Sequence, residues 1–203
     1  MIGSFASVAE AAPTVVLKLQ VEEPFGSGVW KDTGVIRQTG EKAKYRLDYS
    51  ISDTEGSTFE GLVAKVNFPA GQGVLSTVGD LVLPDTVSTV FSSFSGGDFA
   101  VNVNFKSAMS AGATGTLEFT ITGNTNSGPD GKIMTPTITM TGTTVKADSS
   151  REPLSVDAGT GPSWTVKAAV SWAVNKTLVT SPPLYVPDEE AYIVEYEIVA
   201  TRT

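Results

Sequence analysis

Two acidic clusters in this 203-residue sequence are of a type that could carry out chemistry. They are Glu22-Glu23 and Asp188-Glu189-Glu190. Carboxylates of this kind bind cations, or act in pairs as the acid and the nucleophile or base of a glycosidase. No pattern in the sequence brings two carboxylates together across a groove. We therefore expect both clusters to lie at strand ends or in a loop as solvated surface, and we assign no catalytic residue.

A second candidate set consists of Asn124, Asn126 and Asp130, which share one loop. Oxygen ligands at such short spacings can converge on Ca²⁺. However, Pro129 occupies the sixth position of this loop, where a calcium loop of the helix–loop–helix type has glycine, and no Glu follows at the twelfth. The alternative is a plain hairpin loop made of residues that tolerate turns. We expect no bound metal, and these three residues remain the candidate ligands.

Aromatic residues form the third set, because exposed rings can bind sugars. Trp164 and Trp172 alternate in phase with neighbouring valines, which predicts that both lie in a core. Trp30 instead lies in a glycine-bearing stretch, Gly26 to Asp32, and is the candidate ligand-binding residue.

Missing residue types exclude several functions. The chain has no His and no Cys, so it cannot form a Ser-His-Asp or Cys-His catalytic site or an ordinary zinc site. We expect no cofactor. With 22 acidic and 14 basic residues the net charge is −8 and no basic stripe occurs, so nucleic acid is not an expected partner. No apolar run approaches the length of about 18 residues that would suggest a membrane span.

The first twelve residues are rich in small side chains. Ala9-Glu10-Ala11 has the form of a secretory cleavage site, but neither a charged segment nor a full apolar segment precedes it. Residues 1–12 are therefore either a disordered N-terminus or the remnant of a signal peptide. The fold is expected to begin at Pro13.

Alternation of apolar and polar residues dominates the remainder. From Ala43 to Ile51 the odd positions are apolar and the even positions are polar, which is typical of a strand with one face on a core. Similar alternation occurs in residues 15–21, 62–68, 99–105, 116–122 and 134–141. Gly, Pro, Asn, Asp and Ser separate these runs. The pattern predicts an all-β, antiparallel β-sandwich over residues 13–147. Pro136 requires its strand to lie at an edge or to begin after the proline.

Residues 148–162 are mostly polar, and we predict that they form a linker. Residues 163–203 resume the alternation and are predicted to form a partial second β unit. A shift of 147 residues aligns Tyr45 with Tyr192, Tyr49 with Tyr196 and Ile51 with Ile198, which suggests a repeated unit. Two alternatives remain. Any two alternating strands can align this well, and the C-terminal strands could instead complete the first sheet as one merged sandwich.

The turn chemistry resembles that of the Ig-like repeat domains of bacterial cell-surface proteins. The matching segments are Gly40-Glu41 before Tyr45, Phe68-Pro69-Ala70-Gly71, Ser110 to Phe119, Pro129-Asp130-Gly131, Val174-Asn175-Lys176 and Asp188 to Tyr196. The resemblance implies an Ig-like sandwich and an extracellular, wall-attached or cell-surface location. It also implies a non-enzymatic structural or adhesive role, with a host or cell-wall component or copies of the same chain as partners.

Some related stalk domains join a first-strand Lys to a last-strand Asn or Asp by an isopeptide bond. Here Lys18 lies on the polar side of its strand, and residues Met134 to Thr144 contain neither Asn nor Asp. We expect no such crosslink in the first unit. For Lys176 the question stays open, because its partner would lie beyond Thr203.

Two other roles fit the sequence. The chain could be a carbohydrate-binding module that uses exposed aromatic side chains, with Trp30 first among them. It could also be a self-assembling fibre subunit whose C-terminal segment completes a neighbour's sheet.

Overall fold

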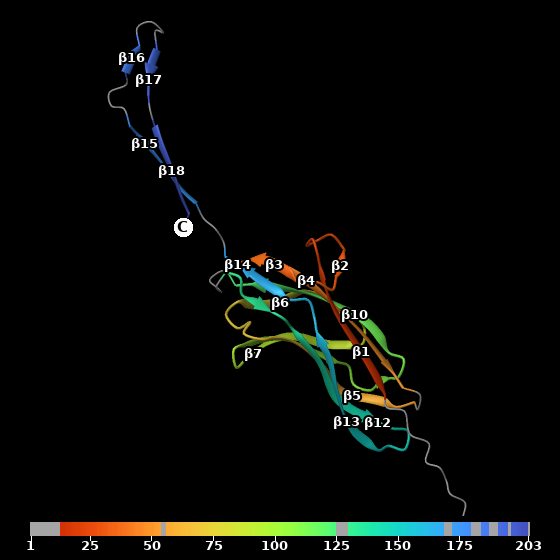
Figure 1. Ribbon diagram of the computed structural model, residues 1–203. Helices are drawn as coiled ribbons and strands as arrows, with labels where there is room; N and C mark the ends of the chain where they lie inside the picture. Colours follow the sequence, from red (N-terminus) through yellow and green to blue (C-terminus); the bar gives the residue numbers. More distant parts are fainter. Residues whose placement is uncertain are drawn as a thin grey trace, which may run out of the picture. The chain divides into compact units, whose positions relative to one another are not determined.

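The computed structural model describes residues 13–53, 56–124, 130–168, 172–179, 184–186, 191–194 and 196–202 (Figure 1). The chain divides between Ala168 and Ala169 into two compact units, which we call unit 1 and unit 2. The described residues contain no helix long and apolar enough to cross a membrane.

Unit 1 contains two large antiparallel sheets and one small sheet. The β4 sheet has the order β2 (Trp30–Lys31), β1 (Thr14–Glu22), β4 (Lys42–Ser52), β10 (Thr114–Gly123) and β6 (Leu75–Val82). The β5 sheet has the order β13 (Arg151–Thr160), β12 (Thr137–Val145), β5 (Thr58–Phe68), β8 (Asp98–Phe105) and β7 (Val87–Ser95), and β9 (Met109–Ser110) pairs with β5. The small sheet has the order β11 (Ile133–Met134), β14 (Trp164–Lys167) and β3 (Val35–Gln38).

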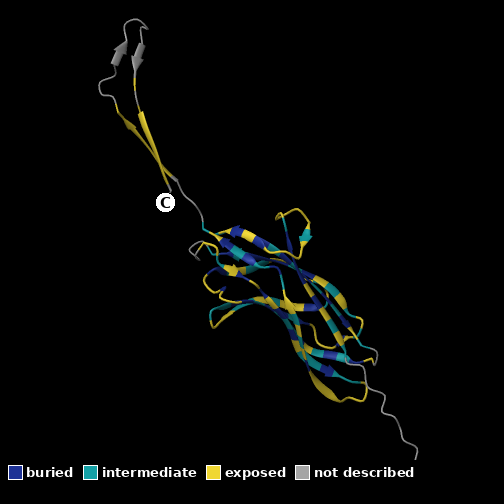
Figure 2. Ribbon diagram, in the orientation of Figure 1, coloured by how far each residue is buried: buried dark blue, intermediate teal, exposed yellow. Residues whose placement is uncertain are grey.

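The core of unit 1 lies between the two large sheets and follows the alternation of the sequence. In β4 every odd position from Ala43 to Ile51 is buried, whereas the even positions from Lys44 to Ser50 are partly exposed. In β5 the side chains of Leu62, Ala64, Val66 and Phe68 are buried in the same way. Dark and lighter segments accordingly alternate along the strands in Figure 2. The predicted all-β sandwich is confirmed, and β12 begins directly after Pro136, as expected.

The predicted linker at 148–162 is wrong, because residues 151–160 form strand β13. This strand pairs with β12 from Arg151, opposite Val145, to Thr160, opposite Thr137. Its inward side chains are Leu154, which is buried, and the smaller, half-buried Val156 and Ala158. A strand with so few large apolar side chains on its inner face has almost the composition of a loop, and for this reason the sequence pattern did not predict it.

Strand β14 also belongs to unit 1, so the predicted start of the second unit at residue 163 is wrong as well. Trp164 is only 1% exposed and Val166 only 3%, and both are part of the main core. The burial of Trp164 confirms its prediction as a core residue. β14 pairs in parallel with β3, from Trp164 opposite Val35 to Lys167 opposite Gln38.

Unit 2 contains two antiparallel strand pairs: β15 (Trp172–Leu178) with β18 (Tyr196–Arg202), and β16 (Leu184–Val186) with β17 (Ala191–Ile193). In the first pair Leu178 lies opposite Tyr196, just as Leu17 lies opposite Tyr49 where β1 pairs with β4. The predicted shift of 147 residues relates Tyr49 to Tyr196 but does not relate Leu17 to Leu178, so the repeat stays a prediction. The match is partial, because β4 is one continuous strand whereas the corresponding residues of unit 2 are divided between β17 and β18.

The chain enters and leaves unit 1 at opposite ends of strand β4. Thr14, the first residue of β1, pairs with Ser52 at one end of β4. At the exit, Lys167 pairs with Gln38, which accepts a hydrogen bond from Glu41, next to the other end of β4. A strand rises about 3.4 Å per residue, so these two ends are roughly 34 Å apart.

Candidate functional site

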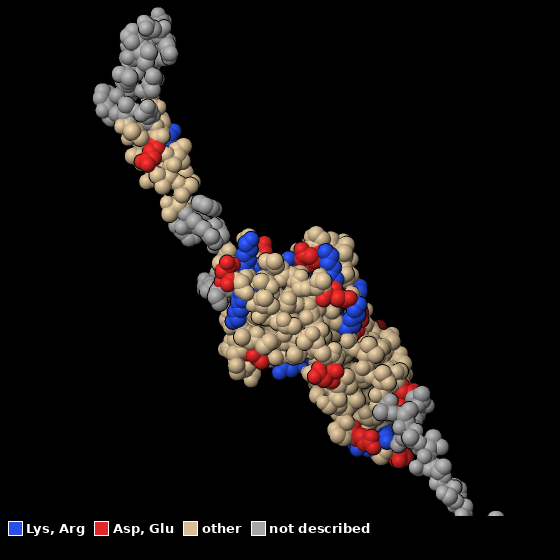
Figure 3. Space-filling view, in the orientation of Figure 1, with Lys and Arg blue, Asp and Glu red and all other residues tan. Residues whose placement is uncertain are grey.

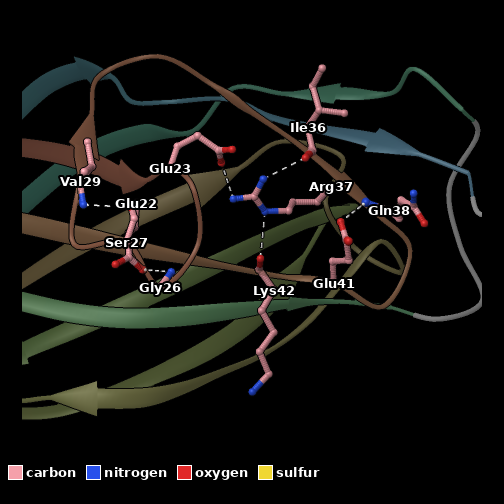
Figure 4. A network of polar contacts seen from close by, with 10 residues as sticks. All are labelled: Glu22, Glu23, Gly26, Ser27, Val29, Ile36, Arg37, Gln38, Glu41 and Lys42. Carbon is pink, nitrogen blue, oxygen red and sulfur yellow. Dashed lines mark hydrogen bonds and ion pairs between the residues drawn. The ribbon is translucent and has the colours of Figure 1, made fainter.

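The loop from Glu23 to Val29, between β1 and β2, is fixed by the buried carboxylate of Glu22. This carboxylate accepts hydrogen bonds from the backbone N–H of Gly26 (2.9 Å; Figure 4) and from that of Gly28 (2.6 Å). Both glycines have positive φ angles, of 80° and 74°, which other residues seldom adopt. Glu22 is only 4% exposed, so the expectation of solvated surface is wrong for this residue. The other acidic cluster, Asp188 to Glu190, lies outside the described residues.

Arg37 links this loop to the body of unit 1. Its guanidinium donates to the carbonyl oxygens of Lys42 and Ile36 (3.0 Å each) and to the carboxylate of Glu23 (2.5 Å) (Figure 4). The Arg37 side chain is 9% exposed and that of Glu23 is 33% exposed. Because one nearly buried cation meets two carbonyls and a carboxylate, the group is well suited to hold the loop in place. No local pattern predicts this ion pair, since Arg37 and Glu23 are 14 residues apart.

A hollow of about 450 Å³ opens beside this network. It is lined by Glu23, Pro24, Phe25, Arg37 and residues 40–42. It holds two carboxylates, but Glu23 is bonded to Arg37 and Glu41 accepts from the backbone N–H of Gln38 (2.6 Å). A glycosidase requires one carboxyl group that can give up a proton and another that faces the substrate. Because both carboxylates are engaged with neighbouring groups, the arrangement favours a structural role.

Two tyrosines of β4, Tyr45 and Tyr49, are buried in the core, and they differ in whether the hydroxyl group has a hydrogen-bond partner. The Tyr45 hydroxyl is buried and has no hydrogen-bond partner among the described residues. Burial raises the pKa of Tyr45, and the nearby charge of Arg37 opposes this shift. The Tyr49 hydroxyl shares a hydrogen bond with the Thr86 hydroxyl, and burial likewise raises the pKa of Tyr49.

Replacing Tyr45 with Phe is therefore expected to stabilise unit 1 by about 1 kcal/mol, because an unpaired buried hydroxyl costs about 1–3 kcal/mol. Tyr49→Phe is the matched control. It removes a made hydrogen bond and is expected to cost about 1 kcal/mol. Urea unfolding curves of the two variants measure both changes. Destabilisation by Tyr45→Phe would contradict the proposed orphan hydroxyl.

Trp30 is half-buried rather than freely exposed. The guanidinium carbon of Arg46 lies 4.8 Å from the centre of a Trp30 ring, and Lys44 Nζ lies 5.6 Å from it. Lys44 also pairs with Glu118 (2.5 Å), and this hydrogen bond holds the pKa of Lys44 above its usual value. Two cations therefore compete for the ring surface on which a sugar would stack. No finding tests Trp30 as a ligand-binding residue, and it stays a prediction.

The candidate metal ligands are only partly described. Asn126 lies outside the described residues, and the backbone N–H of Asn124 donates to the carbonyl of Val74 (2.6 Å). Asp130 is exposed, and its carboxylate accepts a hydrogen bond from the backbone N–H of Ala168 (3.0 Å). Among the described residues no three acidic side chains form a group that could hold a metal ion. The Asp130 contact connects the β10–β11 loop to the end of unit 1.

The two lysines considered for an isopeptide bond make other contacts. Lys18 is about half exposed and forms an ion pair with Asp32 (3.3 Å). Hydrogen bonds from Gln20 and from Lys18 hold the pKa of Asp32 below its usual value. In unit 2, Lys176 Nζ lies 3.7 Å from the centre of the Tyr196 ring.

Other charged side chains of unit 1 form pairs of opposite sign. At the β5 sheet, Arg151 forms an ion pair with Glu60 (2.5 Å), and Lys146 forms one with Glu152 (3.1 Å). In Figure 3 blue and red side chains lie next to one another near the margins of the visible face of unit 1. Exposed pairs of this kind contribute little to stability, about 0–1 kcal/mol each. They do leave the charge of unit 1 dispersed rather than gathered into a single patch on this face.

No protein-family model matches the sequence. No curated protein is significantly similar to it either. Distant matches occur among solved structures. The chain is similar to the major pilin subunit of Bacillus cereus, with a TM-score of 0.43 and 9% identity, over 94% of this chain and 55% of the pilin. It thus spans about half the length of that protein.

Two cohesins match over more of their own length. A cohesin module from a Clostridium perfringens family 33 glycoside hydrolase gives a TM-score of 0.38 at 12% identity, over 77% of this chain and 100% of the module. The seventh ScaB type I cohesin of Pseudobacteroides cellulosolvens gives 0.39 at 11% identity, over 76% and 94% of the two chains. Similarities this distant do not determine partners or activity.

Proposed function

We propose that the chain is a non-enzymatic structural segment of an extracellular bacterial surface protein, in which unit 1 is a rigid spacer. The observation that carries the proposal is the placement of the chain ends of unit 1. The chain enters beside Ser52 and leaves beside Gln38, at opposite ends of β4. In a module of a stalk, the chain must enter at one end and leave at the opposite end. Unit 1 meets this requirement.

The pairing of β1 supports the same role, because it places this strand where tension would act. A pull on Thr14 away from unit 1 draws β1 along its own axis against β4. The two strands pair from Thr14, opposite Ser52, to Val21, opposite Tyr45. Antiparallel hydrogen bonds run perpendicular to the strands, so such a pull loads all of them together. Strands loaded in this way resist force better than strands separated one bond at a time.

The polar network gives independent support. Glu22, Glu23 and Arg37 are all engaged in fixing the loop from Glu23 to Val29, and none of them faces a substrate-sized cleft with its bonding groups free. Buried charges are costly unless they are paired and hydrogen-bonded. Here they stabilise a connection at the end of unit 1 where the chain leaves. Their arrangement is that of a structural support.

Single-molecule force measurements test the spacer role. The chain has no cysteine, so two introduced cysteines define the pulling points. With Thr14→Cys and Lys167→Cys in the full-length chain, we expect one unfolding event that releases roughly 50 nm, because an extended residue spans about 3.4 Å.

The matched control pulls the same chain through Thr14→Cys and Ser52→Cys. All three positions are exposed, so the substitutions leave the core unchanged. Thr14 and Ser52 are opposite each other, and tension between them separates β1 from β4 one pair at a time. We expect this geometry to yield at a clearly lower force. Equal forces in the two geometries, or stepwise unfolding of unit 1 along the first, would refute the spacer role.

A second role, self-assembly, is favoured by the exposed apolar side chains of unit 2. Val174 is 67% exposed, Ile198 66% and Tyr196 51%, and the latter two alternate on one side of β18. Isolated two-stranded ribbons are only marginally stable in water, and the unpaired backbone groups at their edges can hydrogen-bond to strands of another chain. Sedimentation velocity over a range of protein concentrations tests this role. A sedimentation coefficient that does not change with concentration would exclude it.

A further inference from the structure

The outward side of the β5 sheet forms a row of side chains contributed by five strands. Pairing places Phe91 opposite Asn102, Asn102 opposite Lys65, Lys65 opposite Thr139, and Thr139 opposite Asp157. Their strand neighbours, such as Val66 and Val103, are buried, so this row points away from the core. We call this side of the sheet the outer face.

Amide and hydroxyl groups dominate the outer face, and several are held in place. Asn102 Nδ2 donates to Ser93 Oγ (2.8 Å), and Asn104 Nδ2 donates to Thr89 Oγ1 (2.9 Å). Each of these amides keeps a second N–H and a carbonyl oxygen for another partner. Because both Asn side chains are fixed by a bond to the adjacent strand, a ligand would not have to order them.

Charge is scarce along this row. The row holds one cation, Lys65, and one anion, Asp157, whereas the whole chain carries a net charge of −8. Strands β7 and β8 contain no Lys or Arg, and their one acidic residue is Asp98, whose carboxylate accepts hydrogen bonds from Asn67 and from the backbone of Ala70. A polyanion would therefore find no cluster of cations on these two strands. An uncharged partner with many hydroxyl groups matches the donors and acceptors of the face without requiring any charge.

Phe91 supplies an exposed aromatic ring beside these polar groups. It is 46% exposed and lies at the β7 edge of the row, directly opposite Asn102. An exposed ring beside a fixed amide offers an apolar surface for the C–H side of a sugar and hydrogen-bonding groups for its hydroxyls. We propose that the outer face binds an uncharged polysaccharide, with Phe91 as the stacking platform and Asn102 and Asn104 as the hydrogen-bonding groups. This inference goes beyond the spacer role, which stands if binding fails.

Binding of the full-length chain to insoluble polysaccharide tests the proposal, with microcrystalline cellulose and chitin as probes. We expect depletion of the chain from solution by at least one of them. The binding should persist in 0.5 M NaCl, because salt screens contacts between charges and leaves neutral contacts intact. Phe91→Ala is expected to weaken binding about tenfold, and Asn102→Ala to weaken it severalfold.

Phe25→Ala is the matched control, because Phe25 is 49% exposed on the loop between β1 and β2. It should leave binding unchanged, and thermal melts should show that both phenylalanine variants remain folded. Three results would overturn the proposal: no binding to either probe, equal binding by the Phe91→Ala variant and the unchanged chain, or loss of binding in salt. Loss on Trp30→Ala with full binding by Phe91→Ala would place the site at Trp30 instead.

Discussion

A chain that ends at Asp148 is expected to be unfolded, whereas a chain that ends at Ala168 folds. The shorter chain lacks β13 and β14 and therefore loses Leu154 and Trp164 from the core. Removal of these side chains alone costs about 2–5 kcal/mol for Leu and about 3–5 kcal/mol for Trp. The total is comparable to the whole stability of a typical domain, about 5–15 kcal/mol. It also leaves the edge of β12 without its partner strand.

Circular dichroism and urea unfolding of the two truncated chains measure this effect. The chain ending at Ala168 serves as the control, since it keeps every strand of unit 1. We expect a cooperative transition only for this longer chain. If the chain ending at Asp148 unfolds cooperatively with the same midpoint, then β13 and β14 do not belong to the sandwich.

Arg37→Met is expected to destabilise unit 1 by about 2–3 kcal/mol. The substitution retains an apolar side chain of similar length but removes the donors to Glu23 and to the carbonyls of Ile36 and Lys42. Breaking a fully buried ion pair costs about 3–5 kcal/mol. Because Glu23 is one-third exposed, water screens part of this cost. Urea unfolding gives the loss, and a double-mutant cycle with Glu23→Gln isolates the share of the ion pair.

Lys42→Met provides the comparison for Arg37. Lys42 pairs with Asp80 at 3.4 Å, but the two side chains are 50% and 63% exposed. An exposed pair of this kind contributes about 0.2–1 kcal/mol. Similar losses for Arg37→Met and Lys42→Met would mean that the Arg37 network does not hold the loop.

Alternation predicted the central strands because each has one face on the core. In β4 the odd positions from Ala43 to Ile51 are all apolar and, apart from Ala43, large, so a local pattern was sufficient. β13 was not predicted because its inward face carries one large apolar side chain, Leu154, and the charged residues Arg151, Glu152 and Asp157 lie on the same short strand. β14 was assigned to the wrong unit because its four residues continue the alternation of the residues that follow. Its partner strands, β11 and β3, both lie earlier in the sequence, and β3 lies far away from it.

The polar contacts could not be predicted in the same way. Glu22-Glu23 was noticed as an acidic cluster, but its burial depends on how the loop from Glu23 to Val29 folds over it. The outer face could be predicted even less from a local pattern of residues. Phe91, Asn102 and Lys65 come from three strands, and only the pairing of β7, β8 and β5 places them in one row.

Calorimetry of residues 13–168 beside the full-length chain tests most directly the claim that unit 1 is a self-contained spacer. The boundary between Ala168 and Ala169 predicts that the main transition has the same midpoint and enthalpy in both chains, and that the shorter chain sediments as a monomer. If the shorter chain aggregates or melts far below the full-length chain, then residues 169–203 complete the first sandwich, and unit 1 is not a spacer that folds on its own.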